Sequence, residues 1–196
     1  MPMVFHPLAL KKLTGNLRYA KPGQNLPEHI LPSNPAMDVM TDLERVSAAT
    51  VSPGELIDHA LDIMIYKGIR LLLVENREAN VIGLITSTDI QGEKPMKLTQ
   101  EAGIRHAEII VKDIMTPIQD IEVLDMEVVR RSHVGDIVRS LTTAGRQHAL
   151  AVQESDAGQE IRGIFSTSQI GRQMGMPIKP SEKAQTFAEL EMAIAS

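Results

Sequence analysis

An internal repeat constrains this chain more than any other feature of its sequence. The segment MDVMTD at residues 37–42 is matched by KDIMTP at residues 112–117, and both read aspartate, a β-branched residue, methionine and threonine. Two later segments, residues 56–68 and 133–145, each place apolar residues at positions i, i+3, i+4 and i+7 and end at a glycine. This spacing is typical of an amphipathic helix, and a glycine after the last turn can close it. The chain is therefore predicted to use one supersecondary unit twice.

Two strands are expected after each of these helices. Residues 69–75 and 81–86 in the first copy, and residues 148–153 and 161–166 in the second, are apolar runs separated by a polar turn. The turn spacing suits an antiparallel hairpin. One β-α-β-β-α unit alone would leave a sheet face uncovered, so we expect the two units to pack through their sheets. The predicted fold class is α/β (α+β).

The repeat also divides the chain into segments. The expected order is a proline-rich N-terminal arm at 1–36, a first repeat at 37–95, a helical linker at 96–110, a second repeat at 111–176 and a C-terminal helical tail at 177–196. Proline at this density opposes regular helix and removes sheet donors, so the arm is expected to be extended. It either packs on the body or on a partner subunit, or forms a partly mobile tail. The tail helix lacks the basic stripe of membrane-surface helices, which favours docking on protein.

Composition excludes several classes of function. A net charge of −5 over 196 residues argues against a nucleic-acid surface. The apolar runs are too short to span a bilayer, and the absence of cysteine fits a reducing cytoplasm. The six histidines show no metal-binding spacing, and the chain has neither a phosphate-binding loop nor a nucleophile elbow. We therefore expect a cytoplasmic protein that is not an enzyme and needs no metal or obligatory cofactor.

The repeated motifs resemble a tandem pair of CBS domains, also called a Bateman module, over residues 36–175. They are the leading Asp-Val/Ile-Met-Thr segment, the amphipathic helix, and a glycine-led strand that ends in hydroxyl residues. The resemblance implies a homodimer of stand-alone modules that bind adenosine-containing ligands, of the AMP, ADP, ATP or S-adenosylmethionine type, between their repeats. It implies a regulatory sensor that passes occupancy to a partner protein, whose identity stays open. The alternative is a structural or interaction module with no physiological nucleotide.

The stretch GLITSTDI at residues 83–90 is the main candidate site. Thr86 and Thr88 lie two apart, so in an extended chain their hydroxyls point to the same side. Asp89 falls at a predicted helix start, and its carboxylate offers only acceptors, which suits a cis-diol. By the resemblance, the hydroxyls face a phosphate or ribose and Asp89 binds the two ribose hydroxyls. The structural alternative is that Thr88 or Asp89 only caps a short helix.

The resemblance adds further residues to the Asp89 site. Arg70 and His148 fall at the start of the strand that follows each helix, where a basic side chain would lie near ligand phosphates. The alternatives are a surface ion pair for Arg70 and a hydrogen-bonded structural role for His148. The ligand's base would rest on the leading segment of the second repeat, from Ile121 to Met126. Plain core residues are equally expected there.

The second copy departs from this pattern. The stretch GIFSTSQI at residues 163–170 keeps Ser166 and Ser168 but has Gln169 in place of the acid, and Thr41 of the other repeat's leading segment completes this weaker set. Glutamine carries no charge and cannot accept from both ribose hydroxyls equally well. We therefore predict an asymmetric module, with one adenosyl site at Asp89 and a second cleft that is weak, empty or differently used.

Overall fold

Two copies of the predicted unit are present in the structure, a computed structural model that describes residues 23–156 and 158–178. Residues 1–22 of the expected arm and the expected C-terminal helix lie outside these ranges. The first copy contains β2 (Thr50–Val51), α1 (Ile57–Lys67), β3 (Leu71–Glu75), β4 (Val81–Thr86) and α2 (Ser87–Gln91). The second copy contains β6 (Val123–Asp125), α6 (Val134–Thr143), β7 (His148–Ser155), β8 (Gly158–Ser166) and α7 (Thr167–Met174). The predicted fold class is confirmed.

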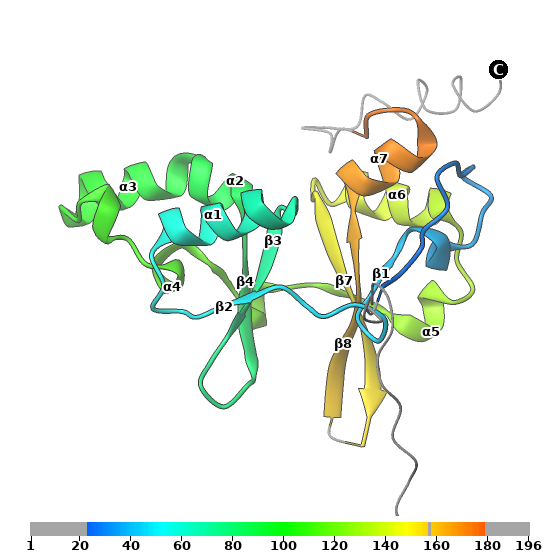
Figure 1. Ribbon diagram of the computed structural model, residues 1–196, viewed down its shortest axis with the longest axis horizontal. Helices are drawn as coiled ribbons and strands as arrows, with labels where there is room; N and C mark the ends of the chain where they lie inside the picture. Colours follow the sequence, from blue (N-terminus) through cyan, green and yellow to red (C-terminus); the bar gives the residue numbers. More distant parts are fainter. Residues whose placement is uncertain (1–22, 157, 179–196) are drawn as a thin grey trace, which may run out of the picture.

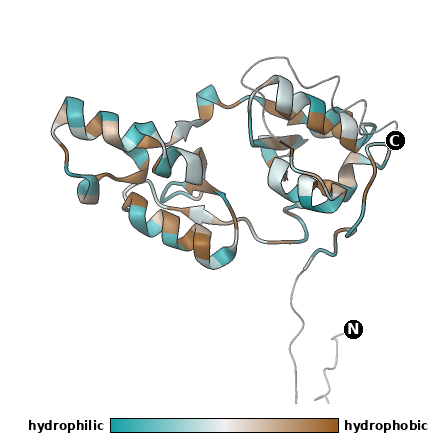
Figure 2. Cartoon of the chain, turned by 90° about the horizontal axis from the view of Figure 1, so that it is seen from above, coloured by the Kyte–Doolittle hydropathy of each residue, from teal (hydrophilic) through white to brown (hydrophobic). Residues whose placement is uncertain are grey.

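The two main helices end as the sequence predicts. Gly68 follows α1 with φ 66°, and Gly145 follows the last turn of α6 with φ 64°. This left-handed conformation costs glycine little and lets the chain turn from each helix into the next strand. Figure 2 shows the two copies as separate lobes whose helices carry both hydrophobic and hydrophilic bands.

Each sheet is completed by a strand from the other copy, which the sequence did not reveal. The strand order is β2-β3-β4-β5 in one sheet and β1-β8-β7-β6 in the other. The edge strand β1 (Thr41–Asp42) leads into the first copy but pairs antiparallel with β8 of the second. The edge strand β5 (Thr116–Pro117) leads into the second copy but pairs antiparallel with β4 of the first. The repeated Met-Thr segments therefore connect the copies (Figure 1).

This strand exchange explains the glycine that opens each hydroxyl-ended motif. A Cβ added at Gly83 would lie 2.5 Å from the backbone oxygen of Thr116. A Cβ added at Gly163 would overlap the side chain of Met40. Both contacts are closer than real Cβ atoms allow: at Gly83 the neighbour is rigid backbone, and at Gly163 the Met40 side chain would have to move. In each sheet, the exchanged methionine-containing segment thus packs against the glycine of the hydroxyl-ended motif.

A buried ion pair fixes one exchanged strand but not the other. The Arg162 guanidinium on β8 binds the Asp42 carboxylate on β1, with side-chain exposures of 8% and 5%, and it also contacts Glu44 at 2.7 Å. Burial alone would raise the pKa of Asp42, but the hydrogen bonds and charge of Arg162 hold it below its ordinary value. In the first sheet, the corresponding register places Pro117 beside Gly83, next to Ile82.

The copies pack through their sheets, as predicted. Each copy has its own apolar core beneath its helices. A third cluster is built on buried side chains from the central strands of both sheets, Leu71, Leu73 and Leu150. Partly buried residues from both copies surround it, including Leu84 and Ile164. Burial of this shared face gives the two copies a reason to stay together.

Short elements complete the described chain. They are the 3-10 helices η1 (Ala36–Val39), η2 (His106–Glu108) and η3 (Ile118–Asp120), and the helices α3 (Glu93–Ala102), α4 (Val111–Ile114) and α5 (Met126–Val129). The described part of the arm packs on the body, where the Gln24 side chain donates to Met40 O at 2.9 Å and accepts from Asp42 N at 2.8 Å. Within residues 23–156 and 158–178, no helix has the length and apolar character needed to cross a bilayer.

Candidate ligand-binding clefts

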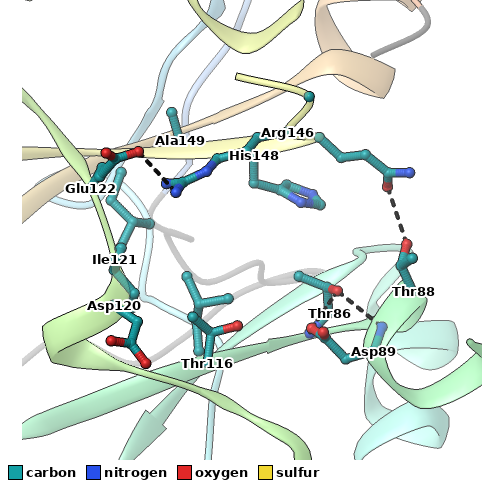
Figure 3. Close-up of a pocket in the computed structure, with 14 residues that line it drawn as sticks. Thr86, Thr88, Asp89, Thr116, Asp120, Ile121, Glu122, Arg146, His148 and Ala149 are labelled. Atoms are coloured by element: carbon teal, nitrogen blue, oxygen red, sulfur yellow. Dashed lines mark hydrogen bonds and ion pairs between the residues drawn. The ribbon is translucent and has the colours of Figure 1, made fainter. Parts of the chain in front are cut away.

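A cavity of about 500 Å³ opens between the copies beside Asp89, and we call it the Asp89 cleft. Three stretches that are distant in sequence meet there: the end of β4 with the start of α2, the segment around η3, and the start of β7. The predicted residues that line it are Thr86, Thr88, Asp89, Ile121 and His148. Figure 3 shows the Thr86–Asp89 pair on one wall and the imidazole of His148 facing it from the other.

Asp89 closes the first turn of α2 through a capping box. The Thr86 backbone N–H donates to Asp89 Oδ2 at 2.8 Å, and the Asp89 backbone N–H donates to Thr86 Oγ1 at 3.2 Å. The Thr86 hydroxyl also donates to Asp89 Oδ2 at 2.6 Å. Such reciprocal bonds satisfy donors that a helix start leaves open. The capping role left open by the sequence is therefore present, with Thr86 rather than Thr88 as the cap.

The other carboxylate oxygen of Asp89 is held by a lysine. Lys94 Nζ lies 2.6 Å from Asp89 Oδ1 and donates to the carbonyl oxygen of Ile114 at 2.9 Å. Ile114 ends α4, two residues before β5, so this ammonium connects the first copy's α3 with the segment that leads into the second. Three donors thus occupy an aspartate whose side chain is 14% exposed. An ionised carboxylate has about four acceptor sites.

The opposite wall of the Asp89 cleft carries charges that sequence reasoning missed. Arg146 forms an ion pair with Glu122 at 2.9 Å, and Asp120 lines the cleft beyond Ile121, near Thr116 (Figure 3). Both acids flank Ile121: Glu122 lies within the expected base-contact segment, Ile121 to Met126, and Asp120 directly precedes it. Arg146 directly follows the helix-ending Gly145, a position whose approach to the cleft depends on the packing of the two sheets.

A second cavity, of about 510 Å³, lies on the other side of the shared face, and we call it the Arg70 cleft. The four residues of the predicted weaker set line it: Thr41, Ser166, Ser168 and Gln169. The Thr41 hydroxyl donates to Gln169 Oε1 at 3.3 Å. The Ser166 and Ser168 hydroxyls lie 2.9 Å apart. Arg172 of α7, which sequence reasoning missed, also lines this cleft.

Two residues that the sequence assigned to the Asp89 site lie elsewhere. Arg70 lines the Arg70 cleft instead. Met126 is 1% exposed in the core of the second copy. The strand register explains the position of Arg70. Its carbonyl accepts from Ser87 N, as that of Gln147 accepts from Thr167 N, so the counterpart of Arg70 is Gln147 and not His148.

His148 forms part of the wall of both clefts. Its strand position corresponds to that of the apolar Leu71, because His148 pairs with Ser166 as Leu71 pairs with Thr86. Burial of the imidazole, together with the charge of Arg70, lowers the pKa of His148 to about 4, although the Asp89 carboxylate acts in the opposite direction. His148 is therefore neutral at pH 7 and adds a hydrogen-bonding group, but no positive charge, to either cleft.

Comparison with known proteins gives a family match for the first copy. Residues 36–93 match the family model for the CBS domain. None of the curated proteins compared with the chain is a significant match.

Solved structures, CBS-domain proteins among them, share the fold. An uncharacterized conserved protein from Pyrococcus horikoshii aligns with a TM-score of 0.50 and 22% identity, over 72% of this chain and 92% of that one. The CBS-domain containing protein ATU1752 from Agrobacterium tumefaciens aligns with a TM-score of 0.51 and 18% identity, over 70% and 91%. The CBS domain pair of protein MJ0100, solved with 5′-methylthioadenosine and S-adenosyl-L-methionine, aligns with a TM-score of 0.51 and 19% identity, over 74% and 98%. Residues 36–93 thus match the CBS domain model, and the described chain shares the fold of these solved structures.

Proposed function

We propose that this protein is a regulatory module that binds an adenosine-containing ligand in the Asp89 cleft and passes its occupancy to a partner protein. One observation carries the proposal: Thr86, Thr88 and Asp89 meet Ile121 and His148 in a single cavity between the copies. A volume of about 500 Å³ lies within the usual range for small-molecule sites. The ligand class is further supported by the CBS domain pair of MJ0100, which was solved with two adenosyl compounds.

The lining of the cleft suits the two halves of a nucleoside. Leu84, Ile121 and Leu150 offer apolar surface for a flat base. The hydroxyls of Thr86 and Thr88 and the carboxylate of Asp89 form a polar edge for the sugar. A carboxylate accepts from both hydroxyls of a cis-diol, and charge-assisted bonds of this kind contribute about 1.5–3 kcal/mol each. Affinity would therefore depend more on Asp89 than on the neutral groups around it.

Ligand binding at Asp89 would change contacts outside the cleft. Because Lys94 already occupies Asp89 Oδ1, a ribose that takes this oxygen displaces the ammonium or shares it. Lys94 also donates to Ile114 O beside β5, so displacement loosens the connection between α3 and the exchanged strand. A ligand shifts a conformational equilibrium only through different affinities for its two states, and this exchange supplies such a difference. The shifted state would be read by a second copy in a homodimer or by another protein.

Replacement of Asp89 tests the proposal. Isothermal titration calorimetry on the full chain would use S-adenosylmethionine, 5′-methylthioadenosine, AMP and ATP. We expect at least one compound to bind below millimolar and to lose about tenfold or more of its affinity in Asp89→Ala, which corresponds to about 1.4 kcal/mol. The change also removes a helix cap, at a cost of about 0.5–2 kcal/mol in folding stability.

Asp136→Ala is the matched control. Asp136 accepts from His133 N at 2.8 Å in a capping box at the start of α6 and lines neither cleft. It should lose similar stability and keep full affinity for each compound. Gln169→Ala should likewise leave binding at the Asp89 cleft unchanged. Equal affinity in wild type and Asp89→Ala for every compound would rule out the assigned site.

The alternative function is a structural or interaction module without a nucleotide. It is favoured by the three donors that already satisfy Asp89, because an aspartate used in this way needs no ligand to explain it. Calorimetry separates the two functions: no binding below millimolar by any of the four compounds supports the structural module.

A further inference from the structure

We propose that residues 184–194 of this chain, which we call the acidic segment, dock in the Arg70 cleft of the same molecule. Docking there would not depend on the proposed function, because the Asp89 cleft takes no part in it. Three features of the molecule favour it: the charge of the Arg70 cleft, the apolar surface inside that cleft, and the place where the described chain leaves the body.

The Arg70 cleft carries positive charge without an acidic partner among the described residues. Arg70 lies just before β3 in the first copy and Arg172 lies on α7 of the second, and both line the cavity. Within residues 23–156 and 158–178, no carboxylate lines this cavity and neither arginine forms an ion pair. Two carboxylates close to its wall in sequence, Asp42 and Glu44, are already bound by Arg162. The cleft therefore has a positive potential that attracts a negatively charged segment.

The inside of the same cavity offers apolar surface. Its wall includes Val46 and Ala48 from the loop before β2, Leu71 on β3 and Ile164 on β8. Leu71, Ala48 and Ile164 also belong to the apolar cluster where the two sheets meet. Exposed arginines thus lie beside an apolar wall, and this combination suits a polypeptide in which acidic and apolar side chains are interspersed.

The acidic segment has the matching composition. It reads AQTFAELEMAI, and Glu189 and Glu191 are its only charged side chains. A guanidinium binds a carboxylate through two parallel hydrogen bonds, so each glutamate could pair with one arginine of the cleft. The large apolar residues that accompany the glutamates are Phe187, Leu190, Met192 and Ile194.

The described chain leaves the body at the mouth of the Arg70 cleft. Its last residues, 176–178, line a hollow together with Arg70 and Arg172. Because both arginines also line the Arg70 cleft, the two cavities adjoin. Phe187 comes nine residues after Ile178, a reach of about 30 Å when fully extended and about 14 Å as a helix. The acidic segment can therefore reach the cleft in either form.

Covalent attachment makes a weak contact sufficient. A short linker holds two parts of one chain at an effective concentration of about a millimolar. A segment whose affinity as a separate peptide is only about 0.1 mM would thus be docked in about nine of ten molecules. Because Arg70 belongs to the first copy and Arg172 to the second, the docked segment would connect the two copies and close this cleft with the chain itself.

Thiol labelling of the full chain tests the docking. The chain has no cysteine, so Ser47→Cys places a single thiol in the lining of the Arg70 cleft. Uncharged N-ethylmaleimide should label it up to about tenfold more slowly than the same thiol in a chain with Glu189→Gln and Glu191→Gln, because docking in nine of ten molecules leaves about a tenth accessible. Ser52→Cys is the matched control: it is exposed, lines neither cavity, and should react equally fast with either segment.

Fluorescence tests the arginines separately, because their removal would also change the reactivity of a nearby thiol. The chain has no tryptophan, so Phe187→Trp reports on the acidic segment alone. Arg70→Met and Arg172→Met should each shift its emission to longer wavelength, since a released indole is exposed to water. Arg77→Met removes an exposed arginine that lines neither cleft and should leave the emission unchanged. Arg172→Glu combined with Glu189→Lys should restore the emission lost in Arg172→Glu alone.

Thermal melting confirms that each variant is folded, and three results would overturn the docking. They are equal labelling of Ser47→Cys with the acidic and the neutral segment, an equal change at Ser52→Cys, and protection of a neutral-segment chain by an excess of chains with the acidic segment. The last would assign the segment to the cleft of a second copy. None of them affects the proposed function, which is measured by titration of the Asp89 cleft.

Discussion

The two copies differ in side-chain capping at the start of the helix that follows the hairpin. In the first copy, Thr86 and Asp89 form a capping box on α2. In the second copy, α7 begins without a side-chain cap, and Gln169 instead contacts Thr41 of the exchanged strand and the carbonyl of Val39. The fold thus accepts either a local acid or a neutral residue that reaches across copies. Topology alone does not require the acid, which leaves room for a role of Asp89 in ligand binding.

The exchanged strands show a second difference. In the second sheet, the buried Asp42–Arg162 pair lies where β1 meets β8. In the first sheet, the corresponding positions on β5 and β4 hold Pro117 and Ile82. An equivalent backbone contact therefore forms with a charged pair at these positions in one sheet and with apolar residues at them in the other. The ion pair is therefore not needed to form the contact. Once it is present, however, removal of one partner leaves the other charge buried and uncompensated.

Removal of one partner of the buried pair should have the largest effect. Arg162→Met leaves the Asp42 carboxylate buried without its counter-charge, and we expect a loss of about 3–5 kcal/mol in the free energy of unfolding. Urea denaturation followed by circular dichroism measures this loss. The double variant Asp42→Asn with Arg162→Met should recover more than half of it. A single variant as stable as wild type would show that the two sheets do not differ in this way.

The close approach of backbone to glycine should have the next largest effect. Gly83→Ala forces a methyl group against the rigid backbone of Thr116, and overpacking of this kind costs about 1–3 kcal/mol. Gly163→Ala meets the flexible side chain of Met40, which can move, so its cost should be smaller.

Thermal melting of both variants checks this order. Gly54→Ala is the control, because a Cβ there would meet nothing within 4 Å and should change stability by less than about 0.5 kcal/mol. Equal losses at Gly83 and Gly163 would contradict the difference between rigid and flexible partners.

The smallest expected effect depends on pH. The folded-state pKa of His148, about 4, lies below its ordinary value of 6.5, so the unfolded chain binds a proton first as pH falls. The contribution of His148 to stability is therefore complete above pH 6.5 and is lost between pH 6.5 and 4. Between pH 7 and 5.5 this loss amounts to about 1 kcal/mol.

Exchange of His148 for the residue at the matching position of the first copy tests the effect. His148→Leu should remove this slope from a series of urea denaturations at pH 4.5–7.5. His29→Leu, which replaces an exposed histidine outside both clefts, should retain the slope. The same slope in wild type and His148→Leu would exclude His148 as its source.

The repeat made most of the fold predictable. Periodicity and turn spacing indicated the main helices and hairpins of both copies, because each is a local feature of a dozen residues or so. The exchange of edge strands was not predictable. Each exchanged strand is two residues long, and both copies carry the same Asp-Val/Ile-Met-Thr motif, so nothing local distinguishes pairing with its own sheet from pairing with the other.

The candidate site was predictable where it was contiguous. Thr86, Thr88 and Asp89 lie within one motif, and the structure brings them to one cavity. Arg146, Asp120 and Glu122 reach that cavity only through the packing of the sheets. One signal was present for the position of Arg70: Gly68 and Gly145 are separated by 77 residues, and the same offset places Arg70 opposite Gln147.

The exchange of strands also sets an order for assembly during synthesis. The sheet built on β2, β3 and β4 can close once Pro117 has left the ribosome, whereas β1 must wait for β8, and Asp42 for Arg162, 120 residues later. At about 5–20 residues per second, this delay is on the order of ten seconds. During this delay β1, the first strand among the described residues, is a free edge, open to chaperones or to a neighbouring polypeptide on the same message.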